Sequence, residues 1–264
     1  MRKQILKYKL FLGLALVLLA ACKKDNLPAS TTLPVVQGYL IPGQGITVKL
    51  YQQKTLDDTA KYGSPIAGVA VSVSDGSTSV KLTESSSGVY AYNAAGFLVS
   101  GKSYTMQFTY QGNVVSAKTV MPAKPTNFTT QYAAITITTT TGTPNTAALD
   151  RMSWDNPDSL NHVLVFNNAD GPAFPLSTFG GNRSANFELN TNQAAYIDLV
   201  QNNFPYYGHY QVMLFSVNQE YINMIKGNTG GATSQNLVNL PTNVVNGFGI
   251  FTAMQADTLS FNVF

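Results

Sequence analysis

The chain has 264 residues, and only 11% of them are charged, against about 25% in a typical soluble domain. Its net charge of +3 comes from the first 21 residues, which hold four of the 16 basic residues and leave 12 Lys and Arg against 13 Asp and Glu. Binding to a phosphate backbone requires clustered Lys and Arg, which the sequence lacks, so nucleic acid is excluded as a partner.

The first 21 residues have the pattern of a secretory signal. An apolar run of 12 residues, Leu10–Ala21, follows the basic residues Arg2, Lys3, Lys7 and Lys9. A helix needs about 20 apolar residues to span a bilayer, so residues 1–21 are expected to be a signal peptide. The run ends in Leu19-Ala20-Ala21-Cys22, which resembles the bacterial lipobox. That resemblance implies cleavage before Cys22 and lipidation of its sulfur; an ordinary signal peptide with a free thiol is the alternative.

Residues 22–32 are polar, and we expect them to be a lipidated N-terminus and tether. At about 3.3 Å per extended residue, the tether holds the folded part up to roughly 30 Å from the lipid. Lys23-Lys24-Asp25 resembles the export signals of Bacteroidetes-type surface lipoproteins. This implies an outer-membrane protein, lipid-anchored and exposed at the surface; a periplasm-facing location is the alternative. Cys22 is the only cysteine, so a disulfide is excluded and the hydrophobic core alone must stabilise the fold.

Residues 33–121 carry seven short strand-like segments. Turn signals such as Pro42-Gly43-Gln44-Gly45 and Asp75-Gly76 separate them. This number and spacing of strands predict an antiparallel β-sandwich. The expected strands are Val35–Leu40, Ile46–Tyr51, Val69–Ser74, Val80–Leu82, Gly88–Tyr92, Tyr104–Tyr110 and Val114–Val120.

Three motifs in this segment are similar to those of a known sandwich. They are Pro65–Val71, Gly88-Val89-Tyr90 and Gly101-Lys102-Ser103-Tyr104, and their order resembles the transthyretin-like or carboxypeptidase-regulatory-like β-sandwich. That resemblance implies a fold and no particular activity. Residues 122–125 contain two prolines and are expected to be a linker.

Residues 126–264 predict a second β domain with one or two short helices. Ala194–Gln201 fits either a helix or a strand, and Gln219–Lys226 predicts a helix. In that helix we expect Asn218 at the N-cap, Gly227 as the stop, and Tyr221, Met224 and Ile225 on one face. The expected strands are Phe128–Thr141, a segment around Trp154, His162–Phe166, Gly208–Asn218, Gly247–Ala253 and Leu259–Phe264.

Two of these segments resemble fibronectin type III domains. Gly208–Asn218 is similar to their Tyr-x-Val-x-Ala-x-Asn strand, and Trp154-x-x-Pro157 resembles their second strand. The resemblance implies that Tyr210 is a corner tyrosine, whose hydroxyl bonds the backbone upstream. The expected fold class is therefore all-β, with a transthyretin-like sandwich followed by a fibronectin type III-like sandwich.

The order of lipobox, two sandwiches and the segment Asn243–Ala253 is similar to Bacteroidetes-type outer-membrane lipoproteins of the domain-of-unknown-function 4249 family. Asn246 stands where that family's motif has its first glycine. Such lipoproteins tend to be encoded beside TonB-dependent outer-membrane receptors. The resemblance implies a non-enzymatic binding or partner-docking module, accessory to TonB-dependent uptake. The alternative is a subunit of a surface fibre, in which Leu259–Phe264 complements a neighbour's open sheet edge.

The sequence shows no pattern typical of catalysis. His162 and His209 lie in strand-like segments, the Gly-x-Ser-x-Gly elbow is missing, and a zinc site that includes cysteine cannot form once Cys22 is lipidated. We therefore expect no enzyme activity, no catalytic or metal-binding residue and no cofactor. The oxygen-rich loop Asp155–Asn161 lacks the glycine and terminal glutamate of an EF-hand, and whether it binds calcium stays open.

The aromatic segment Phe204–Tyr210 is the one candidate contact surface in the sequence. Ring faces in a loop stack well on sugars and other flat apolar ligands. Tyr206 and Tyr207 are therefore the candidate contacts for a ligand or partner. The alternative is that these rings fill the core of the second sandwich.

Overall fold

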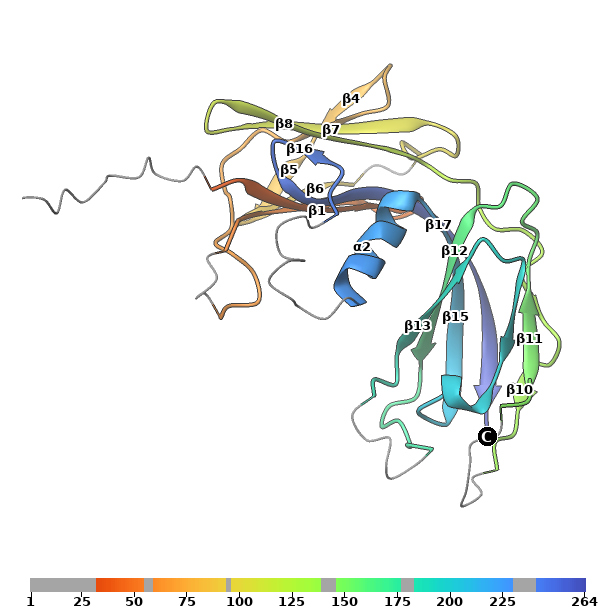
Figure 1. Ribbon diagram of the computed structural model, residues 1–264. Coiled ribbons are helices and arrows are strands. Elements are labelled where there is room, and N and C mark those ends of the chain that lie inside the picture. The colour runs from red at the N-terminus through yellow and green to blue at the C-terminus, as the bar shows by residue number, and fades with distance from the viewer. Residues whose placement is uncertain (1–31, 55–58, 94–95, 139–145, 177–182, 230–240) are drawn as a thin grey trace, which may run out of the picture. The chain divides into compact units, whose positions relative to one another are not determined.

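The computed structural model describes residues 32–54, 59–93, 96–138, 146–176, 183–229 and 241–264. In these ranges the regular structure is almost entirely β-strand, arranged in three sheets, with one 3-10 helix and one α-helix (Figure 1). The expected all-β class is thus confirmed. Cys22 and most of the tether lie outside the described residues.

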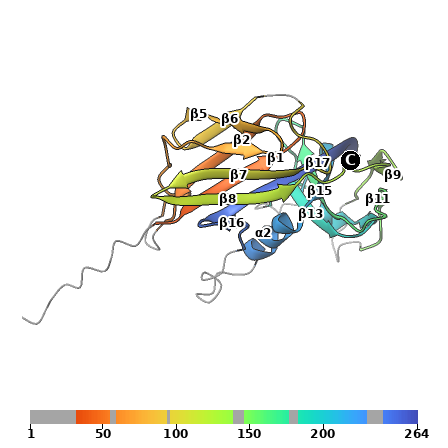
Figure 2. The ribbon, with the colours of Figure 1, turned by 90° about the horizontal axis from the view of Figure 1, so that it is seen from above.

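The first module is a sandwich of two antiparallel layers. In β1, alternate residues such as Val36 and Leu40 are buried while Val35 and Tyr39 are half-buried, because successive side chains of a strand point to opposite faces. Figure 2 shows β7 and β8 lying over β1 and β2. One layer holds β1 (Pro34–Leu40), β2 (Ile46–Gln52), β6 (Val89–Tyr92) and β5 (Thr83–Ser86); the other holds β8 (Asn113–Val120), β7 (Ser103–Tyr110), β3 (Ser72–Ser74) and β4 (Ser79–Lys81).

The second module also has two layers, in the arrangement expected for a fibronectin type III-like sandwich. The larger layer continues into the first module through β17, and β10 runs parallel to the end of β17. The smaller layer holds β14 (Tyr196–Leu199), β11 (Asp150–Ser153) and β9 (Thr129–Thr130); the larger holds β13 (Phe187–Asn192), β12 (Asn161–Asn168), β15 (Gly208–Val217), β17 (Phe248–Val263) and β10 (Ala134–Ile135).

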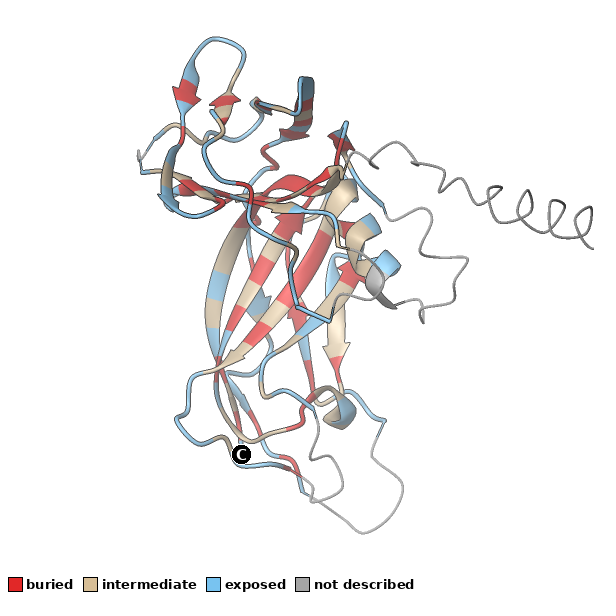
Figure 3. Cartoon of the chain, turned by 90° about the vertical axis from the view of Figure 1, so that its left-hand side faces the viewer, coloured by how far each residue is buried: buried red, intermediate tan, exposed pale blue. Residues whose placement is uncertain are grey.

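An aromatic-rich core fills the second module. Phe166 stacks on Phe187 with ring centroids 4.6 Å apart, and Phe204 and Tyr210 meet their edges. Figure 3 shows buried residues recurring along the long strands. Because Leu164 and Phe166 belong to this core while Val163 belongs to a separate cluster outside it, β12 is apolar on both of its faces.

The 16-residue strand β17 joins the two modules. Its first half pairs in parallel with β1, from Val35 opposite Phe248 to Leu40 opposite Ala253, and its second half pairs antiparallel with β15. Just before it, β16 (Val244–Val245) pairs with β8. Residues 244–253, which follow β9 to β15 of the second module in sequence, therefore complete the sheets of the first, and Leu33–Phe264 forms one compact unit.

A polar network fixes the start of the α-helix to the first module. The Thr119 hydroxyl donates to Glu220 Oε1 at 2.6 Å and accepts from Asn218 Nδ2 at 2.9 Å. Thr252 Oγ1 donates to the same Glu220 oxygen at 3.2 Å. Each of these side chains stands where β8, β17 and the helix meet, so the network holds the helix, which follows β15 of the second module, against the first module.

The α-helix differs in detail from the expectation. Helix α2 spans Gln219–Thr229, starting where predicted but continuing past Gly227. The carbonyl of Asn218 accepts from Tyr221 N at 3.1 Å, while its side-chain amide donates to the Val120 carbonyl at 2.7 Å and so ties the helix to β8. Among helix residues 219–227 the buried one is Ile222, which the expected face omitted, with Tyr221 packed beside it.

Several strand predictions need correction. The predicted strand Phe128–Thr141 is interrupted, with only β9 and β10 formed in its described part and residues 139–141 outside it. Strand β17 replaces the two predicted closing strands. The ambiguous segment Ala194–Gln201 holds a strand, β14, followed by a 3-10 helix, η1 (Gln201–Asn203). Strand β13 and strand β5 were not predicted, because their polar residues give little strand signal.

Candidate functional site

The aromatic segment Phe204–Tyr210 is mostly part of the core. Phe204 and Tyr210 are buried, and Tyr206 and Tyr207 are half-buried. Tyr207 packs against the second core and its hydroxyl donates to the Ile137 carbonyl at 3.4 Å. These contacts give Tyr207 a mainly structural role. Tyr206 pairs through its backbone with Pro175 and keeps part of its side chain in solvent.

Tyr210 has the contact implied by the fibronectin resemblance. Its hydroxyl donates to the Tyr206 carbonyl at 2.8 Å, four residues upstream. Burial raises the pKa of the Tyr210 phenol above its usual value. The ring and its hydrogen bond together fix the turn that leads into β15.

The two histidines occupy different environments. His162 is buried, with Nε2 at 3.1 Å from Ser216 Oγ and Nδ1 at 3.1 Å from the Leu160 carbonyl, and burial lowers its pKa. His209 is exposed, and its Nδ1 lies 2.8 Å from Asp170 Oδ1. The hydrogen bond from His209 lowers the pKa of Asp170. A neutral, enclosed imidazole and an exposed imidazole hydrogen-bonded to a carboxylate are both explained by structure alone.

The loop Asp155–Asn161 uses its oxygens within the fold. Asp155 Oδ2 accepts from Thr126 Oγ1 at 3.2 Å and from Asn127 Nδ2 at 2.5 Å, and Asn156 Oδ1 accepts from Leu160 N at 2.8 Å. In the described ranges, no three His, Cys, Asp or Glu side chains lie close enough together to hold a metal ion.

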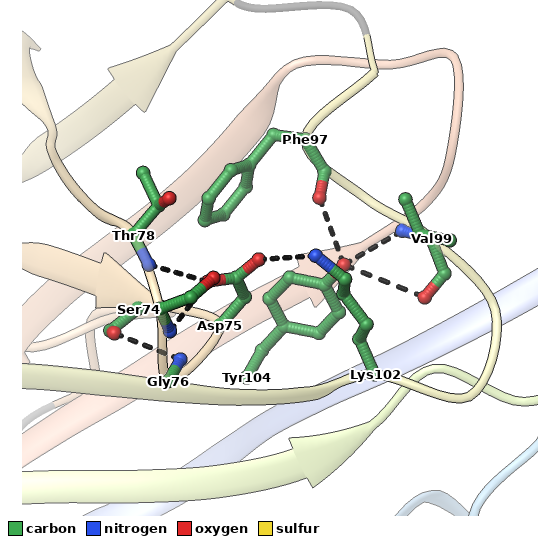
Figure 4. Close-up of polar contacts among 9 residues, drawn as sticks. Ser74, Asp75, Gly76, Thr78, Phe97, Val99, Lys102 and Tyr104 are labelled. Carbon is green, nitrogen blue, oxygen red and sulfur yellow. Dashed lines mark hydrogen bonds and ion pairs between the residues drawn. The ribbon is translucent and has the colours of Figure 1, made fainter.

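Among the described residues, the most strongly perturbed carboxyl group belongs to Asp75, in the turn between β3 and β4 (Figure 4). The Lys102 ammonium lies 2.6 Å from Oδ2, and Oδ1 accepts from Thr78 N at 2.7 Å and from Ser77 N at 3.0 Å. These bonds, led by that from Lys102, hold the pKa of Asp75 far below its usual range. Both oxygens are occupied and the side chain is only 4% exposed. Asp75 therefore connects its own turn to the segment that holds Lys102, and it is not placed to act as an acid or base.

A groove of about 230 Å³ lies on the outer face of the second module's larger sheet, beside α2. We call it the α2 groove. Apolar side chains from β12, β15 and β17 form most of it, and Glu188 of β13 supplies its one charge. Its lining residues are Val163, Val165, Glu188, Met213, Phe215, Val217, Tyr221 and Met254.

Glu188 and Tyr221 give the α2 groove a polar side. Burial, together with the nearby Glu188 carboxylate, raises the pKa of Tyr221 to about 12, so its phenol is protonated and able to donate a hydrogen bond. Glu188 itself is exposed, and no basic side chain in the described ranges forms an ion pair with it. The groove thus offers an apolar floor beside an acceptor with a full negative charge.

The α2 groove was not among the sites expected from the sequence. A signal for it exists: Val163–Phe166 and Val212–Phe215 are continuously apolar, where a strand with one solvent face would alternate. Such runs indicate that both faces of a strand are apolar, but they do not say whether a helix covers the second face completely. Within the described ranges, no helix is long and apolar enough to cross a membrane.

The chain matches one known family. The family described as domain of unknown function (DUF4249) matches residues 24–260. Comparison with curated proteins finds no match.

Solved fibronectin structures are distantly similar to the chain. Against the FN1–FN3 domains of chicken CNTN1, identity is 14% over 71% of this chain and 59% of that one, less than two thirds of its length, with a TM-score of 0.28. Against a segment of two fibronectin type III domains from chicken tenascin, identity is 9% over 87% of this chain and 99% of that one, with a TM-score of 0.26. These distant likenesses carry no functional argument. The family match covers most of the chain, and the protein belongs to the DUF4249 family.

Proposed function

We propose that this protein is a non-enzymatic lipoprotein, anchored to the outer membrane through Cys22, that docks a partner protein at a TonB-dependent uptake system. The basic segment, the apolar run and the lipobox-like Leu19–Cys22 support the anchor. Membership of the DUF4249 family supports the resemblance to Bacteroidetes-type outer-membrane lipoproteins on which this proposal rests. The location at the cell surface and the receptor partner rest on the resemblance in sequence, and the α2 groove carries the proposed docking role.

The chemistry of the α2 groove defines the kind of partner that fits it. An apolar floor of Val165, Met213 and Phe215 suits an apolar side chain, which loses contact with water when it enters. Glu188 beside that floor favours a basic residue next to the apolar one. The proposed occupant is therefore a protein segment that presents an apolar side chain flanked by Lys or Arg.

The fibre alternative gains no support from the terminal strand. Residues 259–263 pair with β15 on one side, and Asn262 and Val263 pair with β10 on the other. Phe264 N donates to the Ile135 carbonyl at 3.0 Å. Donating this strand to a neighbour would first require breaking both sets of hydrogen bonds.

The anchor is tested by comparing the wild-type chain with Cys22→Ser in a host that processes lipoproteins. We expect mass spectrometry of the wild-type N-terminal peptide to show an acyl adduct and the protein to fractionate with outer membranes. The substituted chain should lose both properties. Outer-membrane fractionation of Cys22→Ser, together with an unmodified wild-type cysteine, would overturn the proposed anchor.

The docking role is tested by purifying the lipidated protein from membranes in mild detergent and identifying co-purifying proteins by mass spectrometry. A TonB-dependent receptor is expected among them. Glu188→Lys reverses the groove's charge and should reduce the recovered receptor, while Asp158→Lys makes the same change at an exposed turn and should not. Equal recovery with both variants would remove the α2 groove from the interface, and recovery of no receptor would overturn the docking role.

A further inference from the structure

A second surface feature lies at the end of the first module where the tether enters. Tyr62 is 48% exposed and stacks on Tyr51, with ring centroids 5.0 Å apart and an interplanar angle of 11°. The Lys61 ammonium lies 5.4 Å from the centre of the Tyr62 ring. We call Lys49, Tyr51, Lys54, Lys61 and Tyr62 the Tyr–Lys patch.

The elements of the first module hold this patch on one side. Lys49 and Tyr51 are two residues apart in β2, so their side chains point to the same face of the sheet. Tyr51 also pairs through its backbone with Pro65, which brings the loop containing Tyr62 back to β2. The Lys54 ammonium donates to the Ala60 carbonyl within the same loop. Lys49 and Lys61 are exposed and Lys54 is half-buried, so three lysines lie around a stacked pair of rings.

The patch adjoins the point where the chain leaves the tether. Gln53 N donates to the Leu33 carbonyl at 3.1 Å, and Pro34 lies opposite Gln52 in the sheet. Only residues 23–32 separate Leu33 from Cys22. At roughly 3.3 Å per residue, a lipid on Cys22 keeps this end of the module within about 35 Å of the bilayer.

Resting on the proposed lipid anchor, we propose that the Tyr–Lys patch lies against anionic phospholipid headgroups and so orients the module on the membrane. Tyrosine suits the interface between headgroups and acyl chains, because its ring is apolar and its hydroxyl is polar. Lysine extends an apolar stem and places its charge among phosphates. The ligand chemistry is a phosphate-bearing lipid surface.

The anchor makes a weak contact sufficient. The sequence of the same loop carries Asp57 and Asp58, which lie outside the described residues, so the segment is only weakly basic. A short tether, however, raises the effective concentration of the attached surface to the order of mM. A patch with little affinity for free vesicles is then occupied for much of the time when the chain is anchored.

The test uses the full lipidated protein in vesicles of phosphatidylethanolamine and phosphatidylglycerol, with bromine on the phosphatidylglycerol acyl chains to quench nearby tryptophan. Tyr62→Trp adds a fluorophore at the patch and keeps an aromatic ring there. Tyr132→Trp places one at a similarly exposed site, 53% against 48%, in the second module. The buried Trp154 is common to both variants and supplies the background.

We expect the brominated lipid to remove most of the emission added by Tyr62→Trp and little of that added by Tyr132→Trp. Adding Lys49→Gln, Lys54→Gln and Lys61→Gln to the Tyr62→Trp chain should restore much of its emission. Equal quenching at the two sites, or none at Tyr62→Trp, would overturn the proposed contact.

A flotation assay separates failure of this inference from failure of the anchor. If the lipidated protein floats with the vesicles but Tyr62→Trp is not quenched, the anchor stands and the Tyr–Lys patch does not contact lipid. If the protein does not float, the proposed anchor fails and this inference fails with it.

Discussion

Asn243 holds the backbone of Phe251 from both sides. Its Nδ2 donates to the Phe251 carbonyl at 2.7 Å and its Oδ1 accepts from Phe251 N at 3.0 Å. The same Nδ2 also donates to the Lys118 carbonyl of β8 at 3.2 Å. One side chain thereby connects β17, which lies in the sheet of β1, to a strand of the opposite layer. This contact explains why the segment Asn243–Ala253 forms a compact motif.

Asn243→Ala should destabilise the protein by about 1–3 kcal/mol, because it leaves buried polar groups of the Phe251 backbone without their side-chain partners. Urea unfolding of the full chain measures the change. Asn113→Ala, at an exposed position of β8, is the control and should change stability by less than about 0.5 kcal/mol. Similar losses in the two variants would show that the paired contacts at Phe251 contribute little.

Gly249→Ala should be more damaging than the same change at another glycine with positive φ. Gly249 has φ +97°, and a Cβ there would lie 2.0 Å from the Val36 carbonyl oxygen of β1. Gly76 has a similar φ of +91° but nothing within 4 Å of its Cβ position. Gly76→Ala therefore measures backbone strain alone, about 1–2 kcal/mol. Thermal unfolding should show a clearly larger loss for Gly249→Ala; equal losses would mean that β1 and β17 separate easily at this point.

The local structure of the first module follows well from the sequence. The alternation in Ile46–Tyr51 and Tyr104–Tyr110 places Val48, Leu50, Met106 and Phe108 in the core, as a period of two predicts. Glycine-containing turns mark where these strands end. Strand alternation and turns depend on residues that are neighbours in the sequence, so a short stretch of sequence is enough to predict them.

The long-range arrangement and the α2 groove could not be predicted in the same way. The parallel pairing of Val35–Leu40 with Phe248–Ala253 joins segments more than 200 residues apart. Neither segment contains a sequence feature that identifies the other as its partner. Likewise, Val163 and Phe215 carry a two-faced apolar pattern, but where Tyr221 would stand over them depends on how α2 packs. Tyr206 and Tyr207 show the same limit for a site that was expected, because an aromatic segment in the sequence fits either a contact surface or a core.

Stability should fall as the pH drops below about 6.5, because of His162. Its folded-state pKa lies below the ordinary value of 6.5, owing to burial. Above 6.5 the imidazole is neutral in both states and has no effect; between 6.5 and the lower folded pKa, the unfolded chain gains a proton that the folded chain does not. The free energy of unfolding then decreases by up to about 1.4 kcal/mol per pH unit.

Urea unfolding between about pH 7.5 and pH 5 measures this slope. His162→Gln should flatten it, whatever its effect on stability at neutral pH. His209→Gln removes the other histidine of the chain and should leave most of the slope in place. An unchanged slope in His162→Gln would contradict the assignment to the buried imidazole.

Asp75→Asn should lower stability at neutral pH and lose that effect in acid. The bond from Lys102 leads the causes that depress the pKa of Asp75 below its ordinary 3.8. The ionised carboxylate therefore stabilises the folded state above pH 3.8, and this contribution disappears as the pH falls through the folded pKa. Unfolding measured near neutrality and again in acid should show the difference between wild type and variant shrinking. Lys81→Gln, at an exposed strand position, should show no such trend.

Tyr210→Phe should cost about 0.5–1.5 kcal/mol, the usual net contribution of one hydrogen bond. The change removes the 2.8 Å bond to the Tyr206 carbonyl but keeps the ring, which packs edge-on against Phe204 with centroids 5.8 Å apart. Tyr207→Phe removes a longer bond, 3.4 Å, from a half-buried ring and should cost less. Urea unfolding of the two variants ranks them directly. A larger loss for Tyr207→Phe would mean that the turn before β15 is held by Tyr207, and that the corner assigned to Tyr210 contributes little.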